Sequence, residues 1–157
     1  MILFNSKSGR DSQFLSNFYM HDMVVDGRVY ASVEHYFQAE KYRLAGHAQW
    51  ADFVIASPTP RAAKMRGGPR MKRADKPQLS DEWLAKWNGG VRVVVMKRGL
   101  QAKFKDPELA ARLADTKDQE LVEDNKFDKF WANGRSGKGA NMLGKLLMNL
   151  RATMKTV

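Results

Sequence analysis

The sequence predicts an α+β fold: a mostly helical single domain over residues 1–157 with a small antiparallel β-sheet. The length of 157 residues is typical of one domain, and a hydrophobic fraction of 43% is enough to build a core. Helical periodicity is strongest near the C-terminus, where four leucines between residues 143 and 150 fall at i, i+3, i+4 and i+7. The sheet is expected because two extended segments flank Asp26-Gly27, a dipeptide that favours a two-residue hairpin turn.

Local signals place the other elements along the chain. Residues 2–5 are expected to be extended, and the hairpin occupies 23–31. Ser32 is suited to cap a helix that continues to about Leu44 and stops near Gly46. Further helical segments are expected at 47–56, 60–65, from about 81, at 91–104, 106–115 and 141–153, with a short strand or turn at 121–123. A basic segment, 66–80, and a glycine-rich segment, 132–140, are expected to form loops.

Composition narrows the function classes. The net charge of +10 favours phosphate-bearing ligands, from mononucleotides to nucleic acid, although a basic surface without that role fits equally well. The chain has no cysteine, which excludes disulfides and cysteine-based metal sites, and its three histidines lack metal-ligand spacing. We therefore expect no metal and no cofactor. No apolar run reaches the ~20 residues of a membrane span, so a cytoplasmic protein without a membrane partner is expected.

The segment 32–41 carries the most informative polar residues. On a helix, Glu34, Gln38 and Lys41 share one face, because positions four and seven apart nearly superpose. The apolar side chains Val33 and Phe37 lie beside this row, as they would where a helix lines a pocket. The alternative is a solvent-exposed face with a Glu–Lys pair worth only ~0.3–0.5 kcal/mol.

A second group of candidates surrounds the glycine-rich loop. Glycines before a helix let backbone amides approach a phosphate near Asn141, and Arg135 and Lys138 add donors. Asp128 and Trp131 precede this loop, and the indole ring of a tryptophan could stack on a base. The alternatives are a plain flexible turn and a tryptophan that belongs to the core. The aromatic stretch 14–19, which contains Asn17 and Phe18, could be a core edge or a stacking wall.

Taken together, these segments resemble the NADAR family, also called YbiA-like. The resemblance covers residues 14–151 and rests on four pieces in order: Leu15-Ser16-Asn17-Phe18; Asp26-Gly27 through Ser32-x-Glu34-His35-Tyr36-Phe37-Gln38-Ala39; Val94-Val95-Met96 through Lys103-Phe104; and Leu121-Val122-Glu123 with Asp128, Trp131, Gly139-x-Asn141-x-Leu143-Gly144, Leu147-Met148 and Arg151. The Glu-His-Tyr-Phe-Gln and Asn-x-Leu-Gly-x-x-Leu-Met strings are specific in combination.

The resemblance implies an enzyme that hydrolyses N-glycosidic bonds without a metal. Family activities include cleavage of phosphoribosylamino intermediates of riboflavin synthesis and removal of ADP-ribose from guanine bases, so the substrate could be a small phosphorylated or ADP-ribosyl conjugate or a modified base in DNA or RNA. By position, Glu34 would be the main catalytic carboxylate, and Asp128 would take a second acid–base role or position the ribose. The candidate substrate-binding residues are Asn17, Phe18, Gln38, Lys41, Trp131, Arg135, Lys138 and Asn141.

Some positions depart from the family pattern. Ala132-Asn133 stands where the family often has glycine and an acidic residue, and Met65-Arg66-Gly67 replaces Met-Gly-Arg. The basic loop 66–80 also looks longer than usual, which predicts an influence on substrate choice.

Two other interpretations of the function stay open: a non-catalytic ADP-ribose or nucleic-acid binding module, supported by the charge of +10, and a folded protein whose site is inactive.

Overall fold

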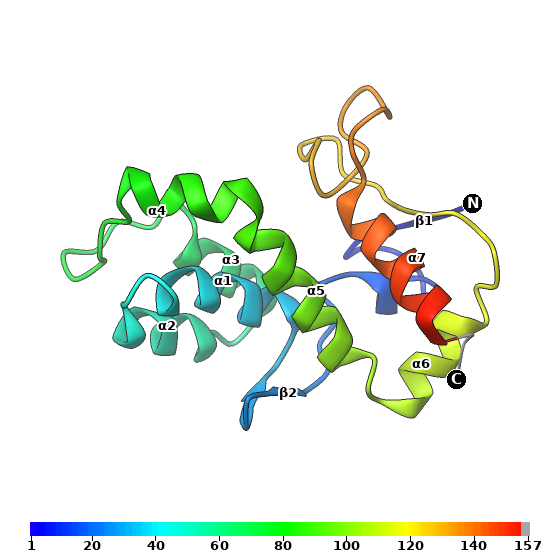
Figure 1. The fold of residues 1–157 in the computed structure, drawn as a ribbon, viewed down its shortest axis with the longest axis horizontal. Coiled ribbons are helices and arrows are strands. Elements are labelled where there is room, and N and C mark those ends of the chain that lie inside the picture. The colour runs from blue at the N-terminus through cyan, green and yellow to red at the C-terminus, as the bar shows by residue number, and fades with distance from the viewer. Residues whose placement is uncertain (155–157) are drawn as a thin grey trace. The chain divides into compact units, whose positions relative to one another are not determined.

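The computed structural model describes residues 1–154, and the chain forms two compact units. The central unit is Met20–Lys103, and the terminal unit combines Met1–Tyr19 with the chain from Phe104 onward. Each unit contains one two-stranded sheet and several helices (Figure 1), so the α+β class with a predominance of helix is confirmed.

The central unit contains the predicted hairpin and most of the helices. Its elements are β2 (Met23–Val25), β3 (Arg28–Tyr30), α1 (Val33–Arg43), α2 (Ala48–Ile55), α3 (Pro60–Gly67), α4 (Asp81–Lys86), a π-helical turn (Trp87–Val91) and α5 (Arg92–Lys103). Asp26 and Gly27 have φ angles of 50° and 78°, and Val25 pairs with Arg28. Positive φ at both turn residues matches the twist of antiparallel strands, so the predicted hairpin is confirmed.

Helix α1 is the centre of this unit. It packs against α2, α3 and α5 (Figure 1), and every residue from Val33 to Glu40 is buried. Periodicity predicted one polar face, but the neighbouring helices cover nearly the whole circumference. The polar side chains of α1 are therefore part of the interior, where each needs a partner.

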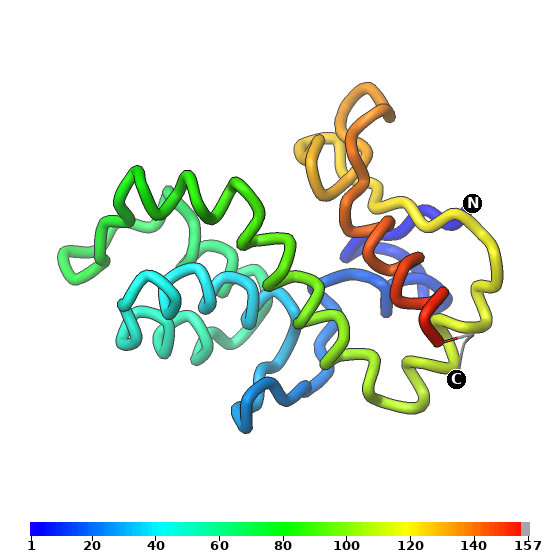
Figure 2. The backbone as a smooth tube through the Cα atoms, viewed as in Figure 1, coloured from blue at the N-terminus to red at the C-terminus, as the bar shows by residue number. Residues whose placement is uncertain are grey.

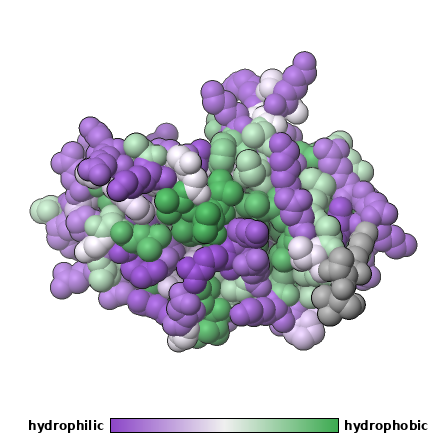
Figure 3. All heavy atoms as spheres, viewed as in Figure 1, coloured by the Kyte–Doolittle hydropathy of each residue, from purple (hydrophilic) through white to green (hydrophobic). Residues whose placement is uncertain are grey.

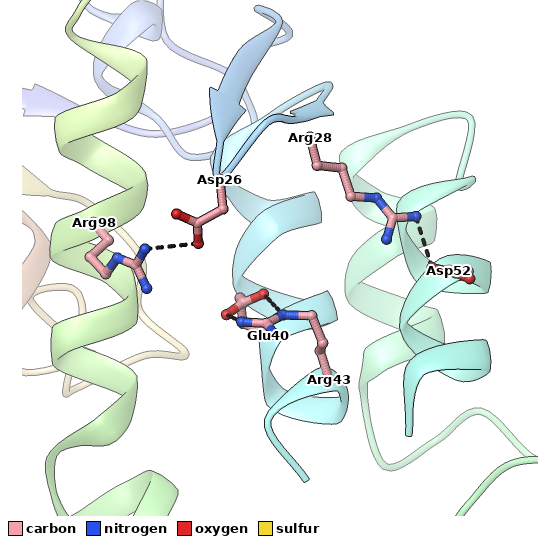
Figure 4. A network of polar contacts seen from close by, with 6 residues as sticks. All are labelled: Asp26, Arg28, Glu40, Arg43, Asp52 and Arg98. Atoms are coloured by element: carbon pink, nitrogen blue, oxygen red, sulfur yellow. Dashed lines mark hydrogen bonds and ion pairs between the residues drawn. The ribbon is translucent and has the colours of Figure 1, made fainter. Parts of the chain in front are cut away.

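Three ion pairs lie at the edges of these elements (Figure 4). Arg98 on α5 reaches Asp26 in the hairpin turn at 3.0 Å, and Arg28 on β3 reaches Asp52 on α2 at 2.8 Å. Within α1, Arg43 donates two hydrogen bonds to Glu40. The first two pairs are solvent-exposed and contribute at most about 1 kcal/mol each, so they align elements that apolar packing already holds together.

The terminal unit joins the two ends of the chain. Its elements are β1 (Ile2–Phe4), a 3-10 turn (Gln13–Leu15), α6 (Pro107–Ala114), β4 (Leu121–Glu123) and α7 (Met142–Met154). Strand β1 pairs with β4 in parallel, with Ile2 opposite Leu121, and Figure 2 shows these distant segments side by side. The sequence predicted an antiparallel sheet only; the parallel pair was missed because no local turn connects its strands.

Helix α7 docks closely on β4. A side chain at Gly144 would bring its Cβ within 2.1 Å of the carbonyl oxygen of Leu121, so only glycine permits this approach. Leu143 and Leu147 are fully buried, as the leucine stripe predicted. Among residues 1–154, no helix combines the length and apolar character that crossing a bilayer requires.

Candidate functional site

The start of α1 is held in place by a buried histidine. The amide of His35 donates to the Ser32 hydroxyl at 3.2 Å, and the imidazole Nδ1 lies 2.7 Å from the same oxygen. Nε2 lies 2.9 Å from the carbonyl oxygen of Ser57. Because a carbonyl only accepts, Nε2 carries the proton, and a neutral ring then accepts the Ser32 hydroxyl proton at Nδ1. Burial lowers the pKa of His35, which favours this neutral form.

Glu34 lies in the first turn of the helix that His35 anchors. Only 7% of Glu34 and 8% of Gln38 are exposed, which excludes the solvent-facing alternative for this pair. Gln38 Nε2 donates a 2.9 Å hydrogen bond to Glu34 Oε1, one helical turn earlier. The bond orients the carboxylate, and the N-terminal end of the helix dipole favours its negative charge.

A glycine on α3 sets the position of Gln38. The Cβ of any other residue at Gly67 would lie 2.4 Å from Gln38 Oε1 and 2.7 Å from Gln38 Cβ. Within the described chain, Oε1 of Gln38 is buried and has no hydrogen-bond partner. Gly67 was not a predicted site residue; the spacing within 32–41 contains no signal of a contact with α3.

Lys41 completes the polar row of α1. Burial lowers the pKa of Lys41 to about 8, Glu34 opposes this shift, and Lys76 adds to it. The Trp83 indole Nε1 donates to the Lys41 carbonyl at 2.9 Å, which ties the helix at this point to α4. Glu34, Gln38 and Lys41 therefore lie together on one helix, with a buried carboxylate and a cation that changes charge near neutral pH.

In the terminal unit, the Asp128 side chain fixes the backbone of Trp131 by a hydrogen bond. Asp128 Oδ1 accepts from the amides of Phe130 at 3.0 Å and Trp131 at 2.8 Å. The Trp131 carbonyl in turn accepts from the amide of Leu143 at 3.1 Å, and the Phe130 and Trp131 rings meet edge to face. One carboxylate oxygen of Asp128 thus has a structural role.

Asn141 is also a structural residue. Its Oδ1 accepts from the Glu123 amide at 3.0 Å, and its Nδ2 donates to the Leu121 carbonyl at 2.9 Å, so its side chain links the start of α7 to β4. The first two amides of α7, those of Met142 and Leu143, donate to backbone carbonyls. They are therefore not available to bind a phosphate, contrary to the simple expectation from the glycine-rich loop.

The remaining donors of this loop are side chains. Arg135 and Lys138 are exposed, and the loop turns through Gly134 and Gly137, whose φ angles are 67° and 75°. Asn133, which departs from the family pattern, braces the loop by hydrogen bonds with Asp124 and Asn125. That contribution of Asn133 was not predicted. The role of Arg135 and Lys138 in binding a phosphate stays a prediction.

The N-terminal aromatic stretch forms a compact turn. The Phe18 amide donates to the Ser16 hydroxyl at 3.1 Å, and the Tyr19 amide donates to the Ser16 carbonyl at 3.1 Å. Asn17 is 7% exposed and Phe18 is partly exposed. Within residues 1–154, no group of three or more His, Asp or Glu side chains is close enough to hold a metal ion.

The predicted site residues are divided between the two units. The central unit contains Glu34, Gln38 and Lys41, and the terminal unit contains Asn17, Phe18, Asp128, Trp131, Arg135, Lys138 and Asn141. The expectation that the two sets share one cleft stays a prediction.

Comparison with known proteins agrees with the resemblance. The NADAR domain family model matches residues 3–155. The N-glycosidase YbiA of Escherichia coli is 36% identical over 137 residues, covering 87% of this chain and 78% of that protein. A riboflavin biosynthesis protein of Vibrio vulnificus is 32% identical over 90% of this chain and 35% of its own length. The NMR structure of E. coli YbiA matches with a TM-score of 0.77 and 33% identity over 98% of this chain and 85% of that one. The chain therefore belongs to the NADAR domain family.

Proposed function

We propose that this chain is an N-glycosidase that hydrolyses the bond between a phosphorylated ribose, or an ADP-ribose, and a nitrogenous base. The observation that carries the proposal is the buried Glu34–Gln38 pair at the start of α1. Support also comes from relatives that bear the names N-glycosidase and riboflavin biosynthesis protein.

The chemistry explains why a buried carboxylate is useful. In the proposed reaction the C1′–N bond breaks, a water oxygen bonds to C1′, and a proton from the water reaches the departing nitrogen. The transition state resembles a sugar cation, which a nearby negative charge stabilises. Glu34 would provide this charge, held in one orientation by the amide of Gln38. The reaction changes no oxidation state and calls for no redox cofactor.

Other residues would bind the substrate. Lys41 provides a cation suited to a substrate phosphate, and its pKa of about 8 leaves it mostly protonated at pH 7. Trp131 offers an aromatic surface for the base, and its backbone amide is fixed by a hydrogen bond to Asp128. Asp128, whose Oδ1 accepts from the Phe130 and Trp131 amides, would assist proton transfer or position the ribose.

Product analysis tests the proposal directly. The purified protein is incubated with a phosphoribosylamino pyrimidine, with ADP-ribosylated guanosine and with an oligonucleotide carrying ADP-ribosylated guanine. Release of the free base and the sugar phosphate, lost in Glu34→Gln and unchanged by EDTA, is the expected result. Turnover of none of the three would contradict the proposal.

The charge of +10 supports a second candidate, a non-catalytic module that binds ADP-ribose or nucleic acid. In that case the wild type and Glu34→Gln bind ADP-ribose equally in calorimetry, and neither releases a base. The buried carboxylate favours catalysis, because a site that only binds phosphates gains nothing from an adjacent negative charge.

A further inference from the structure

Helix α3 and the loop that follows it are strongly basic. Between residues 60 and 80 the chain has seven Lys or Arg residues and one acidic residue, Asp75, which leaves a net charge of +6 out of +10. The cations are Arg61, Lys64, Arg66, Arg70, Lys72, Arg73 and Lys76. In the space-filling view, hydrophilic residues are spread over much of the face shown, with hydrophobic residues between them (Figure 3).

Two of these cations are used to build the surface. Lys76 Nζ donates to the carbonyls of Gly68 at 2.5 Å and Met71 at 3.1 Å, which closes the loop on itself. Arg66 donates to the Phe53 carbonyl at 2.8 Å, and its guanidinium lies 4.0 Å from the centre of the Phe53 ring. The loop therefore has a defined conformation.

Arg73 makes contacts within the protein and is also exposed to solvent. Its guanidinium donates two hydrogen bonds to the Asp75 carboxylate and also lies 4.4 Å from the centre of the Phe53 ring. Phe53 thus has two guanidinium groups close to its ring. These cation–π contacts connect the loop to α2 and occupy part of the surroundings of the Phe53 ring.

Of the four other cations, Lys64 already has an interaction within the protein, and three remain for a partner. Arg61, Arg70 and Lys72 are exposed, and within residues 1–154 none of these side chains makes a hydrogen bond or an ion pair. They project from an ordered scaffold, which lowers the entropy lost when they bind. We propose that this basic surface, defined by Arg61, Arg70 and Lys72, binds the phosphodiester backbone of duplex DNA.

The absence of an available stacking surface among these residues favours a duplex. Trp50 is buried, and the ring of the half-buried Phe53 already has two guanidinium groups close to it, so the exposed groups of this segment are mainly charged. Single strands are typically bound by charge together with base stacking, whereas a duplex presents mainly its backbone, with one charge per ~1.7 Å. The proposal goes beyond N-glycosidase activity, because it concerns DNA without a modified base.

Salt dependence of binding provides the test. Binding of a labelled, unmodified 20-base-pair duplex is measured by fluorescence anisotropy from 50 to 200 mM salt. Each phosphate contact adds about 0.9 to the slope of log K against log salt, so Arg61→Gln/Arg70→Gln/Lys72→Gln should flatten the slope by about 2.7. The charge-keeping variant Arg61→Lys/Arg70→Lys/Lys72→Arg should keep the wild-type slope.

A matched control removes the same charge elsewhere. Lys97, Lys105 and Lys145 are exposed cations outside the surface, and their triple substitution by Gln should leave the slope within about one contact of wild type. Equal slopes for the two Gln triples would overturn the proposal, as would tighter binding of a single strand of the same length. Binding that persists in Glu34→Gln while turnover is lost separates this surface from the proposed reaction.

Discussion

Gln38 Nε2 and Glu34 Oε1 are joined by a 2.9 Å hydrogen bond inside the central unit, where both side chains are more than nine-tenths buried. The Gln38 amide orients the Glu34 carboxylate without adding a charge, and Glu34 also acts electrostatically on Lys41, whose pKa it raises against the effect of burial. In the proposed reaction positive charge develops on the sugar of the substrate, and an oriented carboxylate would stabilise it.

Glu34→Gln should fold normally and lose about 10²–10³ in kcat. The replacement has almost the same shape, and its side-chain oxygen can still accept from Gln38. KM should change little, because the ground-state substrate has no positive charge at C1′. Steady-state kinetics and a melting curve on the same preparation check this. Normal kcat with a lower Tm would assign Glu34 a structural role only.

Gly67→Ala should lower kcat although residue 67 carries no reactive group. Its Cβ would lie 2.4 Å from Gln38 Oε1, so the Gln38 side chain must move and its bond to Glu34 is disturbed. Gly89→Ala is the matched control, because a Cβ there meets nothing within 4 Å. The comparison uses kcat and Tm of both variants. A Gly67→Ala enzyme with wild-type kcat would show that Gln38 does not orient the carboxylate.

The pH dependence of KM should report the charge of Lys41. The pKa of Lys41 is lowered to about 8, so this side chain is a cation at pH 7 and mostly neutral at pH 9. KM for a phosphorylated substrate should therefore rise as pH increases through about 8, while kcat changes less. Lys41→Arg stays charged over this range and should give a flat KM profile. A wild-type KM that is constant from pH 7 to 9 would contradict the role of Lys41 in phosphate binding.

Two substitutions at Asp128 separate structure from chemistry. Asp128→Asn keeps an oxygen that accepts from the Phe130 and Trp131 amides, whereas Asp128→Ala removes both hydrogen bonds. The Ala variant should lose about 1–3 kcal/mol of unfolding free energy, and the Asn variant much less. If Asp128 takes part in proton transfer, the Asn variant should still lose kcat. Normal turnover in Asp128→Asn would limit the residue to holding Trp131.

Local chemistry made much of the fold predictable. The Asp26-Gly27 turn, the Ser32 cap and the leucine stripe of α7 depend on residues within a few positions of one another, so the sequence alone locates them. The helices also begin and end close to the expected positions. The position of the polar row on one face of α1 follows from its spacing in the same way.

The environment of those residues depends on segments far away in the chain. Only packing of α1 among α2, α3 and α5 shows that Glu34 is buried, and only the approach of α3 reveals the part played by Gly67. The parallel pairing of β1 with β4 and the bridge from Asn141 to β4 join residues distant in sequence.

The sequence by itself determined the helices, the hairpin turn and the polar row of α1, because propensity, capping and turn geometry act over a few residues. Tertiary structure decided which polar groups stay available. In the folded chain the first amides of α7 donate to backbone carbonyls, and Lys76 donates to a carbonyl of its own loop. Arg70 and Lys72 stay exposed. The physical reason is that buried donors and acceptors must find partners wherever the chain brings them, and charge or spacing alone does not specify those partners.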